Sequence, residues 1–257
     1  MKIPRLIPVV IILLLFACLP KKPEIPLIEV PSGPLVQMLE QRRQLFTGLK
    51  AVASVKTARS GRKRSYDTVG IMVDGQRRFR VEAYGPLGQS LMTLVWDGTD
   101  VMLRLDDGRV VRPGPAGLER IVGVAMDAGE LCSVLSGNIP AVVQHVETRA
   151  FRKPDGSSMI ELTTGETLRR VHVLLSESDP EQSIRITAIE LYRSGKLVYR
   201  ALYEQMEQIS HYLIPKTMRI ENPERKVSVA IVYDETDVNV PLDDDAFKLP
   251  DAEAPSQ

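Results

Sequence analysis

The chain has 257 residues, of which 44% are hydrophobic and 26% are charged, a balance typical of a globular protein with a sizeable core. Basic and acidic residues are equal in number, 33 of each, so the formal net charge is zero and nucleic acid is not an expected partner. The two cysteines are Cys18 and Cys132, which excludes a disulfide framework. We expect Cys132 to be a small buried core residue.

The first 17 residues have the layout of a secretory signal peptide. Lys2 and Arg5 form a positive start, and the apolar run from Leu6 to Ala17 is shorter than the roughly 20 residues that span a bilayer. The end of this run, Leu15-Phe16-Ala17-Cys18, resembles the lipobox of bacterial lipoproteins. That resemblance implies removal of residues 1–17 and attachment of lipid to Cys18, which anchors the chain to a membrane. An ordinary signal peptide followed by a chance cysteine is the alternative.

The residues after Cys18 bear on location and on domain organisation. In enterobacterial lipoproteins an Asp after the lipidated Cys commonly holds the protein in the inner membrane, whereas this chain has Leu19. The resemblance therefore implies the outer membrane, on its periplasmic face. Residues 18–34 contain five prolines and are predicted to form an extended tether. We expect one domain over residues 35–250 and a flexible tail over residues 251–257.

Helical spacing of apolar residues predicts an amphipathic helix from about Leu35 to Lys50. From about Val52 onward the pattern changes to strands. The run from Arg78 to Tyr84 alternates between apolar and charged residues, and turn signals such as Asp74-Gly75 and Asp97-Gly98 indicate antiparallel hairpins.

Two short helices are predicted midway, over residues 118–124 and 127–135. The second begins with Asp127 and Glu130, spaced as in a capping box, and Gly137 is its expected stop. Strands then resume, for a total of about eleven. The predicted fold is mainly β with some α: a curved antiparallel sheet or half-open β-barrel, covered on one side by a few helices.

The sequence offers little catalytic chemistry. The three histidines, His145, His172 and His211, are far apart, and no cluster has the spacing of metal ligands. No glycine-rich phosphate loop and no nucleophile elbow is present. The run 243–245 consists of three aspartates and is interpreted as a solvated acidic turn rather than a cation site. We expect no enzymatic activity, no cofactor and no metal.

The stretch from Arg78 to Ser90 combines an alternating strand with a Gly-Pro-Leu-Gly loop. It is similar to a strand and loop of the LolB family, the outer-membrane receptors for lipoproteins. The helix that leads into residues 136–140 fits the same order of elements. The runs 214–220 and 227–231 are similar to the closing strands of LolA-like and LolB-like domains. Residues 234–257 differ from the family and look more like the end of broader lipoprotein-sorting relatives.

The resemblance implies a half-open β-barrel closed by helices around an apolar cavity that accepts acyl chains. It also implies a protruding loop whose exposed leucine helps to insert lipoproteins into the membrane, and the matching residue is Leu87. Apolar strand faces supply the candidates for the cavity lining, although such stripes also occur in ordinary cores. These candidates are Phe79, Val81, Met92, Leu94, Trp96, Met102, Val227, Val229 and Ile231.

Three functional hypotheses follow. The first is an outer-membrane lipoprotein receptor or carrier, which takes acyl chains from a periplasmic lipoprotein carrier by passive exchange. The second is a protein of the same fold that binds another lipid or hydrophobic ligand. The third is a structural or interaction lipoprotein of an envelope assembly, in which the cavity is filled.

Overall fold

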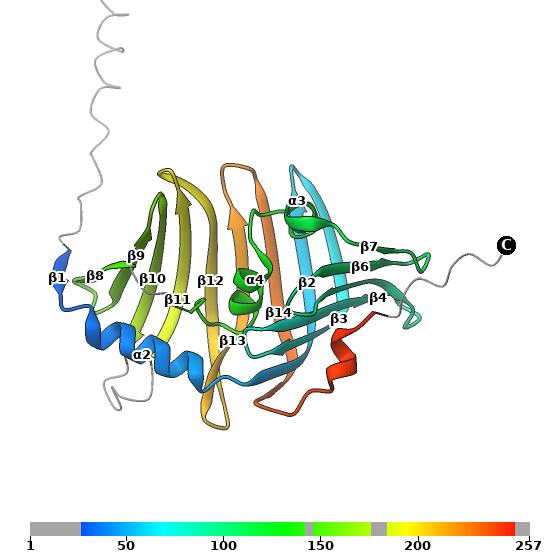
Figure 1. Ribbon diagram of the computed structural model, residues 1–257, viewed down its shortest axis with the longest axis horizontal. Coiled ribbons are helices and arrows are strands. Elements are labelled where there is room, and N and C mark those ends of the chain that lie inside the picture. The colour runs from blue at the N-terminus through cyan, green and yellow to red at the C-terminus, as the bar shows by residue number, and fades with distance from the viewer. Residues whose placement is uncertain (1–26, 142–145, 176–183, 250–257) are drawn as a thin grey trace, which may run out of the picture.

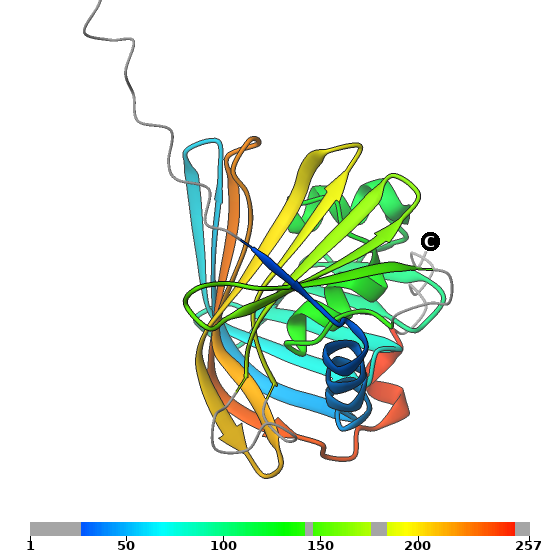
Figure 2. The ribbon, with the colours of Figure 1, turned by 90° about the vertical axis from the view of Figure 1, so that its left-hand side faces the viewer.

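A computed structural model describes residues 27–141, 146–175 and 184–249. The predicted signal peptide, Cys18 and the predicted tail at 251–257 lie outside these ranges. The described residues form one antiparallel sheet that curls strongly but does not close (Figures 1 and 2). The prediction of a mainly β fold with an open, curved sheet is confirmed, whereas the expected number of about eleven strands is too low, since the described residues contain fourteen.

Long antiparallel hairpins make up most of the sheet. The strands are β1 (Ile28–Val30), β2 (Gly48–Arg59), β3 (Arg62–Asp74), β4 (Arg78–Tyr84), β5 (Ser90–Trp96), β6 (Val101–Leu105), β7 (Val110–Val111), β8 (Glu147–Arg152), β9 (Ser158–Thr164), β10 (Thr167–Leu175), β11 (Ile184–Arg193), β12 (Lys196–Ile209), β13 (Tyr212–Asn222) and β14 (Val227–Val238). The helices among the described residues are α2 (Gly33–Gln44), α3 (Gly114–Val122), α4 (Ala128–Leu135) and the 3₁₀ helix η1 (Asp244–Phe247).

The strand order explains why helices lie inside the curve of the sheet. The order is β1-β8-β9-β10-β11-β12-β13-β14-β2-β3-β4-β5-β6-β7, so β7 lies at one edge and β8 lies next to the opposite edge. The chain must therefore cross the sheet between these two consecutive strands. It crosses on the concave side, and α3 and α4 lie in this crossing (Figure 2).

The predicted capping box of α4 is confirmed. The Asp127 carboxylate accepts a hydrogen bond from the backbone N–H of Glu130 at 2.7 Å, and the Glu130 carboxylate accepts one from the backbone N–H of Asp127 at 3.2 Å. Gly137 follows the helix with a φ of 66°, and a Cβ there would lie 2.6 Å from Pro215. Glycine is therefore required both by the backbone conformation and by the close approach of β13.

The first predicted helix is too long at its C-terminal end. It ends at Gln44 rather than near Lys50, and the chain turns into β2 at Gly48. Phe46 and Leu49 are buried, as their helical spacing indicated, but they reach the core from the turn and from β2. At the other end of the segment, β1 pairs with β8, so the last part of the stretch 18–34 belongs to the sheet.

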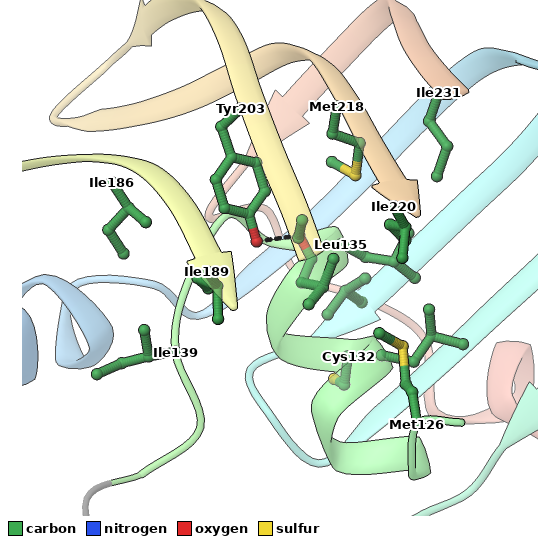
Figure 3. Close-up of a cluster of buried hydrophobic side chains, with 14 of the residues drawn as sticks. Met126, Cys132, Leu135, Ile139, Ile186, Ile189, Tyr203, Met218, Ile220 and Ile231 are labelled. Atoms are coloured by element: carbon green, nitrogen blue, oxygen red, sulfur yellow. Dashed lines mark hydrogen bonds between the residues drawn. The ribbon is translucent and has the colours of Figure 1, made fainter. Parts of the chain in front are cut away.

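The core fills the space between the concave face of the sheet and α4. Figure 3 shows Leu135 and Cys132 of α4 facing apolar side chains from the strands around them, among them Ile220 and Ile231. Cys132 is fully buried, as predicted, with its Sγ 3.6 Å from the carbonyl oxygen of Arg78. Burial raises the pKa of this thiol to about 12.

Candidate ligand cavity

A cavity of about 680 Å³ remains between the concave face of the sheet and the two helices of the crossing. This volume lies within the range of roughly 300–1,000 Å³ that is typical of small-ligand sites. Strands β2 to β6, β13 and β14 supply one wall, and α3 and α4 supply the other. The cavity is therefore a part of the concave side that the crossing segment does not fill.

Strand register explains which side chains reach the cavity. Residues directly opposite each other in an antiparallel pair point to the same face. On β2 and β3 these inward pairs are Arg59 with Arg62, Thr57 with Arg64, and Val55 with Tyr66. The β14 residues that continue the same three rows are Val227, Val229 and Ile231. The wall thus changes from cationic at the turn between β2 and β3 to apolar further inside.

Apart from Arg120, the helical wall is apolar. Leu131 and Leu135 of α4 and Ile121 and Val122 of α3 border the cavity. Gly123, which ends α3 with a φ of 90°, lets the helix approach β14, because a Cβ there would lie 2.7 Å from Val227.

Three tyrosine hydroxyls hold the C-terminal end of α4 against the sheet. Tyr203 of β12 donates to the carbonyl oxygen of Val134 at 3.3 Å (Figure 3), Tyr212 of β13 to that of Ser136 at 3.2 Å, and Tyr233 of β14 to that of Leu135 at 2.8 Å. The last carbonyl groups of a helix lack partners within it, so hydrogen bonds from the sheet help to satisfy them. The Val134 carbonyl oxygen also accepts a bond from the backbone N–H of Gly137 at 3.0 Å. Burial raises the pKa of all three phenols, which therefore remain protonated donors at neutral pH.

Four arginines border the mouth of the cavity: Arg59, Arg62, Arg64 and Arg120. The first three come from the hairpin of β2 and β3, and Arg120 comes from α3, which lies beside the tip of that hairpin (Figure 1). Arg59 donates a hydrogen bond of 3.5 Å to the carbonyl oxygen of Arg120, which links the hairpin to the helix. No aspartate or glutamate is among the described residues that border the cavity.

Six of the nine residues predicted to line a cavity border this one. Phe79 is fully buried and packs against the ring of Trp96 with 6.0 Å between ring centroids, so both belong to the core beside the cavity rather than to its surface. The six that border it are Val81, Met92, Leu94, Val227, Val229 and Ile231.

The prediction for Met102 is wrong, because its assigned register is off by one residue. Met102 pairs with Val95, and both lie in a small cluster with Phe247 and Leu249 on the other face of the sheet. Its neighbour Leu103 pairs with Leu94 and borders the cavity. In a strand such a shift moves every side chain to the opposite face.

Leu87 lies at the tip of the loop between β4 and β5 and is 92% exposed. The loop is closed by a hydrogen bond from the Gly85 N–H to the carbonyl oxygen of Gln89 at 2.8 Å. The Gln89 side chain also accepts a bond from the Leu87 N–H at 3.0 Å. These bonds hold the loop in a conformation that presents an apolar side chain to the surroundings.

Other chemistry is sparse in the described part of the chain. No group of three or more His, Cys, Asp or Glu side chains there could hold a metal ion. His172 lies beside Glu190 on the convex face, His211 is exposed in the turn between β12 and β13, and His145 falls outside the described residues.

Among the residues that the structure describes, no helix is long and apolar enough to cross a membrane.

The arginines of the mouth were not predicted from the sequence. Strands were expected from about Val52 onward, but none was delimited within residues 54–66, although Val55, Thr57 and Arg59 alternate before Ser60-Gly61, and Arg62, Arg64 and Tyr66 alternate after it. Ser60 and Gly61 both have positive φ values, as a tight hairpin requires. The cations obscured the strand pattern, because arginines occupy the face that is apolar further along the strands.

Sequence comparison finds no matching protein-family model and no significantly similar curated protein. Solved structures, however, share the fold. A domain described as an outer membrane lipoprotein-sorting protein from Vibrio parahaemolyticus superposes with a TM-score of 0.60 at 13% identity, over 82% of this chain and 95% of that one. A LolA superfamily protein from Nitrosomonas europaea has a TM-score of 0.57 at 15% identity, over 83% of this chain and 96% of that one.

A DUF1329 family protein from Desulfovibrio piger gives a TM-score of 0.54 at 13% identity, over 83% of this chain and 95% of that one. Identities this low concern the fold alone. The chain therefore has a LolA-like fold, which confirms the structural part of the resemblance to LolA-like and LolB-like domains.

Proposed function

We propose that this protein binds acyl chains in the cavity between its curved sheet and α4, and that it acts as a receptor or carrier in lipoprotein sorting. The observation that carries the proposal is the cavity itself, about 680 Å³ with a largely apolar interior, on a fold shared with a lipoprotein-sorting domain. An acyl chain leaving water gains about 0.8 kcal/mol for each buried CH₂ group. Exchange of such a chain needs neither an energy source nor a catalytic residue.

The proposal places the protein in the cell envelope, attached through a lipid on Cys18 to the periplasmic face of the outer membrane. The resemblance of residues 15–18 to a lipobox and the identity of the neighbour from Vibrio parahaemolyticus support this location. A membrane anchor would keep the cavity near the surface that receives the cargo. Leu87, exposed on its closed loop, is the side chain proposed to enter that surface during transfer.

Native mass spectrometry of the purified protein, mixed with an acylated lipoprotein or with the same lipoprotein stripped of its acyl chains, tests the proposal. We expect a one-to-one complex with the acylated form alone. Met92→Asn, in the cavity wall, should weaken the complex. Leu91→Asn, on the neighbouring residue of β5 that does not border the cavity, should leave it intact. Equal binding of both cargo forms would refute acyl-chain binding.

A second assay separates uptake from delivery. Leu87→Glu should leave uptake in solution unchanged but slow the transfer of bound lipoprotein to vesicles, because a charge at that tip opposes entry into the membrane. Gln89→Glu adds the same charge in the same loop at a residue without an apolar side chain and serves as the control. If both variants deliver cargo as the unchanged protein does, the role of Leu87 is wrong.

A second candidate is a protein that binds another lipid in the same cavity. The four arginines at the mouth favour it, since the acylated cysteine of a lipoprotein carries no negative charge for them to meet. The third hypothesis, an interaction lipoprotein with a filled interior, predicts that no lipid binds at all.

A further inference from the structure

The arginines of the cavity mouth differ from those on the convex face of the same sheet in their partners. On the convex face, several arginines pair with carboxylates on the neighbouring strand or the same strand. Examples are Arg80 with Glu82, Arg170 with Glu161 at 2.8 Å, and Arg200 with Glu190 at 2.8 Å. Among the described residues, no carboxylate lies within ion-pair distance of any of the four mouth arginines, Arg59, Arg62, Arg64 and Arg120.

Sheet register gathers these four charges at one place. Arg59 and Arg62 face each other across the hairpin, Arg64 follows one inward row below on β3, and Arg120 adjoins Arg59 through its carbonyl oxygen. Like charges held this close repel one another, and a nearby anion relieves the repulsion. The guanidinium group also matches the geometry of a phosphate, to which it can donate two parallel hydrogen bonds.

The wall below the arginines has the polarity profile of a membrane lipid. Thr57 borders the cavity near the arginines, and Tyr66 lies one inward row further down. Beyond them the wall consists of side chains such as Val69, Ile71 and, from α4, Leu131. Cation, hydroxyl and hydrocarbon therefore follow one another from the mouth inward, in the order of head group, glycerol backbone and acyl chains.

We propose that the cavity binds an amphiphile with a phosphate-bearing, net anionic head group, and that this head group lies against Arg59, Arg62, Arg64 and Arg120. The acyl chains extend from there between the sheet and α4. This inference rests on the proposed acyl-chain binding and narrows it to a ligand class. Such a cavity would prefer a lipid with an anionic head group to the acylated cysteine of a lipoprotein, which is neutral.

The experiment uses the full chain, purified and stripped of bound lipid. Binding of phosphatidylglycerol and of phosphatidylcholine with identical acyl chains is compared by native mass spectrometry, together with glycerol phosphate, which has the anion but no chains. We expect phosphatidylglycerol to bind at least about tenfold more tightly than phosphatidylcholine, because both carry the same phosphate but the choline cation of phosphatidylcholine is repelled by the arginines. Raising the salt concentration should reduce this ratio, because the mouth arginines are exposed.

The variant Arg62→Gln/Arg64→Gln should reduce the preference to less than about threefold, because it weakens binding of phosphatidylglycerol more than binding of phosphatidylcholine. The matched control is Lys56→Gln/Lys63→Gln, which removes two charges from the same strands at positions that alternate with the inward residues and do not border the cavity. This control should keep the full preference. Far-ultraviolet circular dichroism of both variants reports on folding.

The possible outcomes distinguish a failure of the anion preference from a failure of the proposed acyl-chain binding. If neither phospholipid binds, the proposed acyl-chain binding fails and the inference fails with it. If both phospholipids bind equally, acyl-chain binding stands and the preference for an anion is refuted. If glycerol phosphate binds as tightly as phosphatidylglycerol, the mouth is a phosphate site without a role for the chains, and the inference is again overturned.

Discussion

The hydroxyl group of Tyr233, on β14, donates a 2.8 Å hydrogen bond to the carbonyl oxygen of Leu135, at the end of α4. Leu135 borders the cavity, so this bond joins the cavity wall formed by the helix to the wall formed by β14. Tyr233 is 2% exposed, which means that water cannot replace the bond if it is lost.

We expect Tyr233→Phe to lower the free energy of unfolding by about 1–2 kcal/mol, because it leaves the Leu135 carbonyl buried without this donor. Urea unfolding followed by circular dichroism measures the change. Tyr66→Phe is the control, since no described residue forms a hydrogen bond with the hydroxyl of this half-buried tyrosine, and it should stay within about 0.5 kcal/mol of the unchanged protein. Equal effects of the two substitutions would contradict the anchoring role of Tyr233.

Substitutions at two neighbouring residues of β6 should have different effects on stability and on lipid uptake. Met102→Ala should cost about 2 kcal/mol of stability, because it opens a void in the convex-face cluster around Phe247, and it should leave lipid binding unchanged. Leu103→Asn should weaken lipid binding at a smaller cost in stability, because Leu103 borders the cavity and is only half-buried. Loss of binding in Met102→Ala at a temperature where the variant is folded would show that this register is wrong.

Glu190 should make stability depend on pH. His172, whose Nε2 lies 3.6 Å from a Glu190 carboxylate oxygen, together with Tyr192 and Arg200, lowers the pKa of Glu190 from 4.5 to about 2. Because the folded-state pKa is the lower one, the ionised carboxylate stabilises the fold above pH 4.5, and this contribution is lost as the pH falls toward 2.

The variant Glu190→Gln should therefore lose about 1–2 kcal/mol at pH 7 and clearly less at pH 3, as measured by urea unfolding at both values. Glu204→Gln, which removes an exposed carboxylate on β12, controls for the change in net charge. A deficit of Glu190→Gln that is the same at both pH values would rule out this linkage.

The thiol of Cys132 should be inert in the folded protein. It is fully buried and its pKa is raised to about 12, so almost no thiolate exists at pH 8. In a Cys18→Ala background we expect no reaction with a thiol reagent at pH 8 over hours, and one equivalent of thiol after denaturation. Rapid labelling of the native protein would mean that α4 separates readily from β4.

Local signals in the sequence predicted much of the fold. The alternation in residues 78–84 identified β4, and the pair Asp127 and Glu130 identified the start of α4. Both signals depend on a few adjacent residues, and for that reason they could be interpreted without knowledge of the remaining chain. The strand β1 has only three residues, and its pairing with β8 joins residues more than a hundred positions apart, so no local pattern marks it.

The candidate site was predictable only in part, because an inward register depends on partners distant in sequence. Val227, Val229 and Ile231, which strict alternation placed on one face of their strand, border the cavity. Met102 and Leu103 are both apolar, so the pattern of β6 alone could not decide which one faces inward. The cluster around Phe247 occupies the other face and makes both faces of this strand apolar.

The two edge strands of the sheet do not pair with each other, and this has a consequence for the size of ligand that the interior could accept. The sheet ends at β7 on one side and at β1 on the other, and these two edges are not hydrogen-bonded to each other. In a closed barrel, widening the interior breaks a ladder of backbone hydrogen bonds, whereas here it changes only the curvature of a continuous sheet. We therefore expect the interior to be adjustable at low cost, so that the acyl-chain binding proposed above would accommodate chains of different number and length.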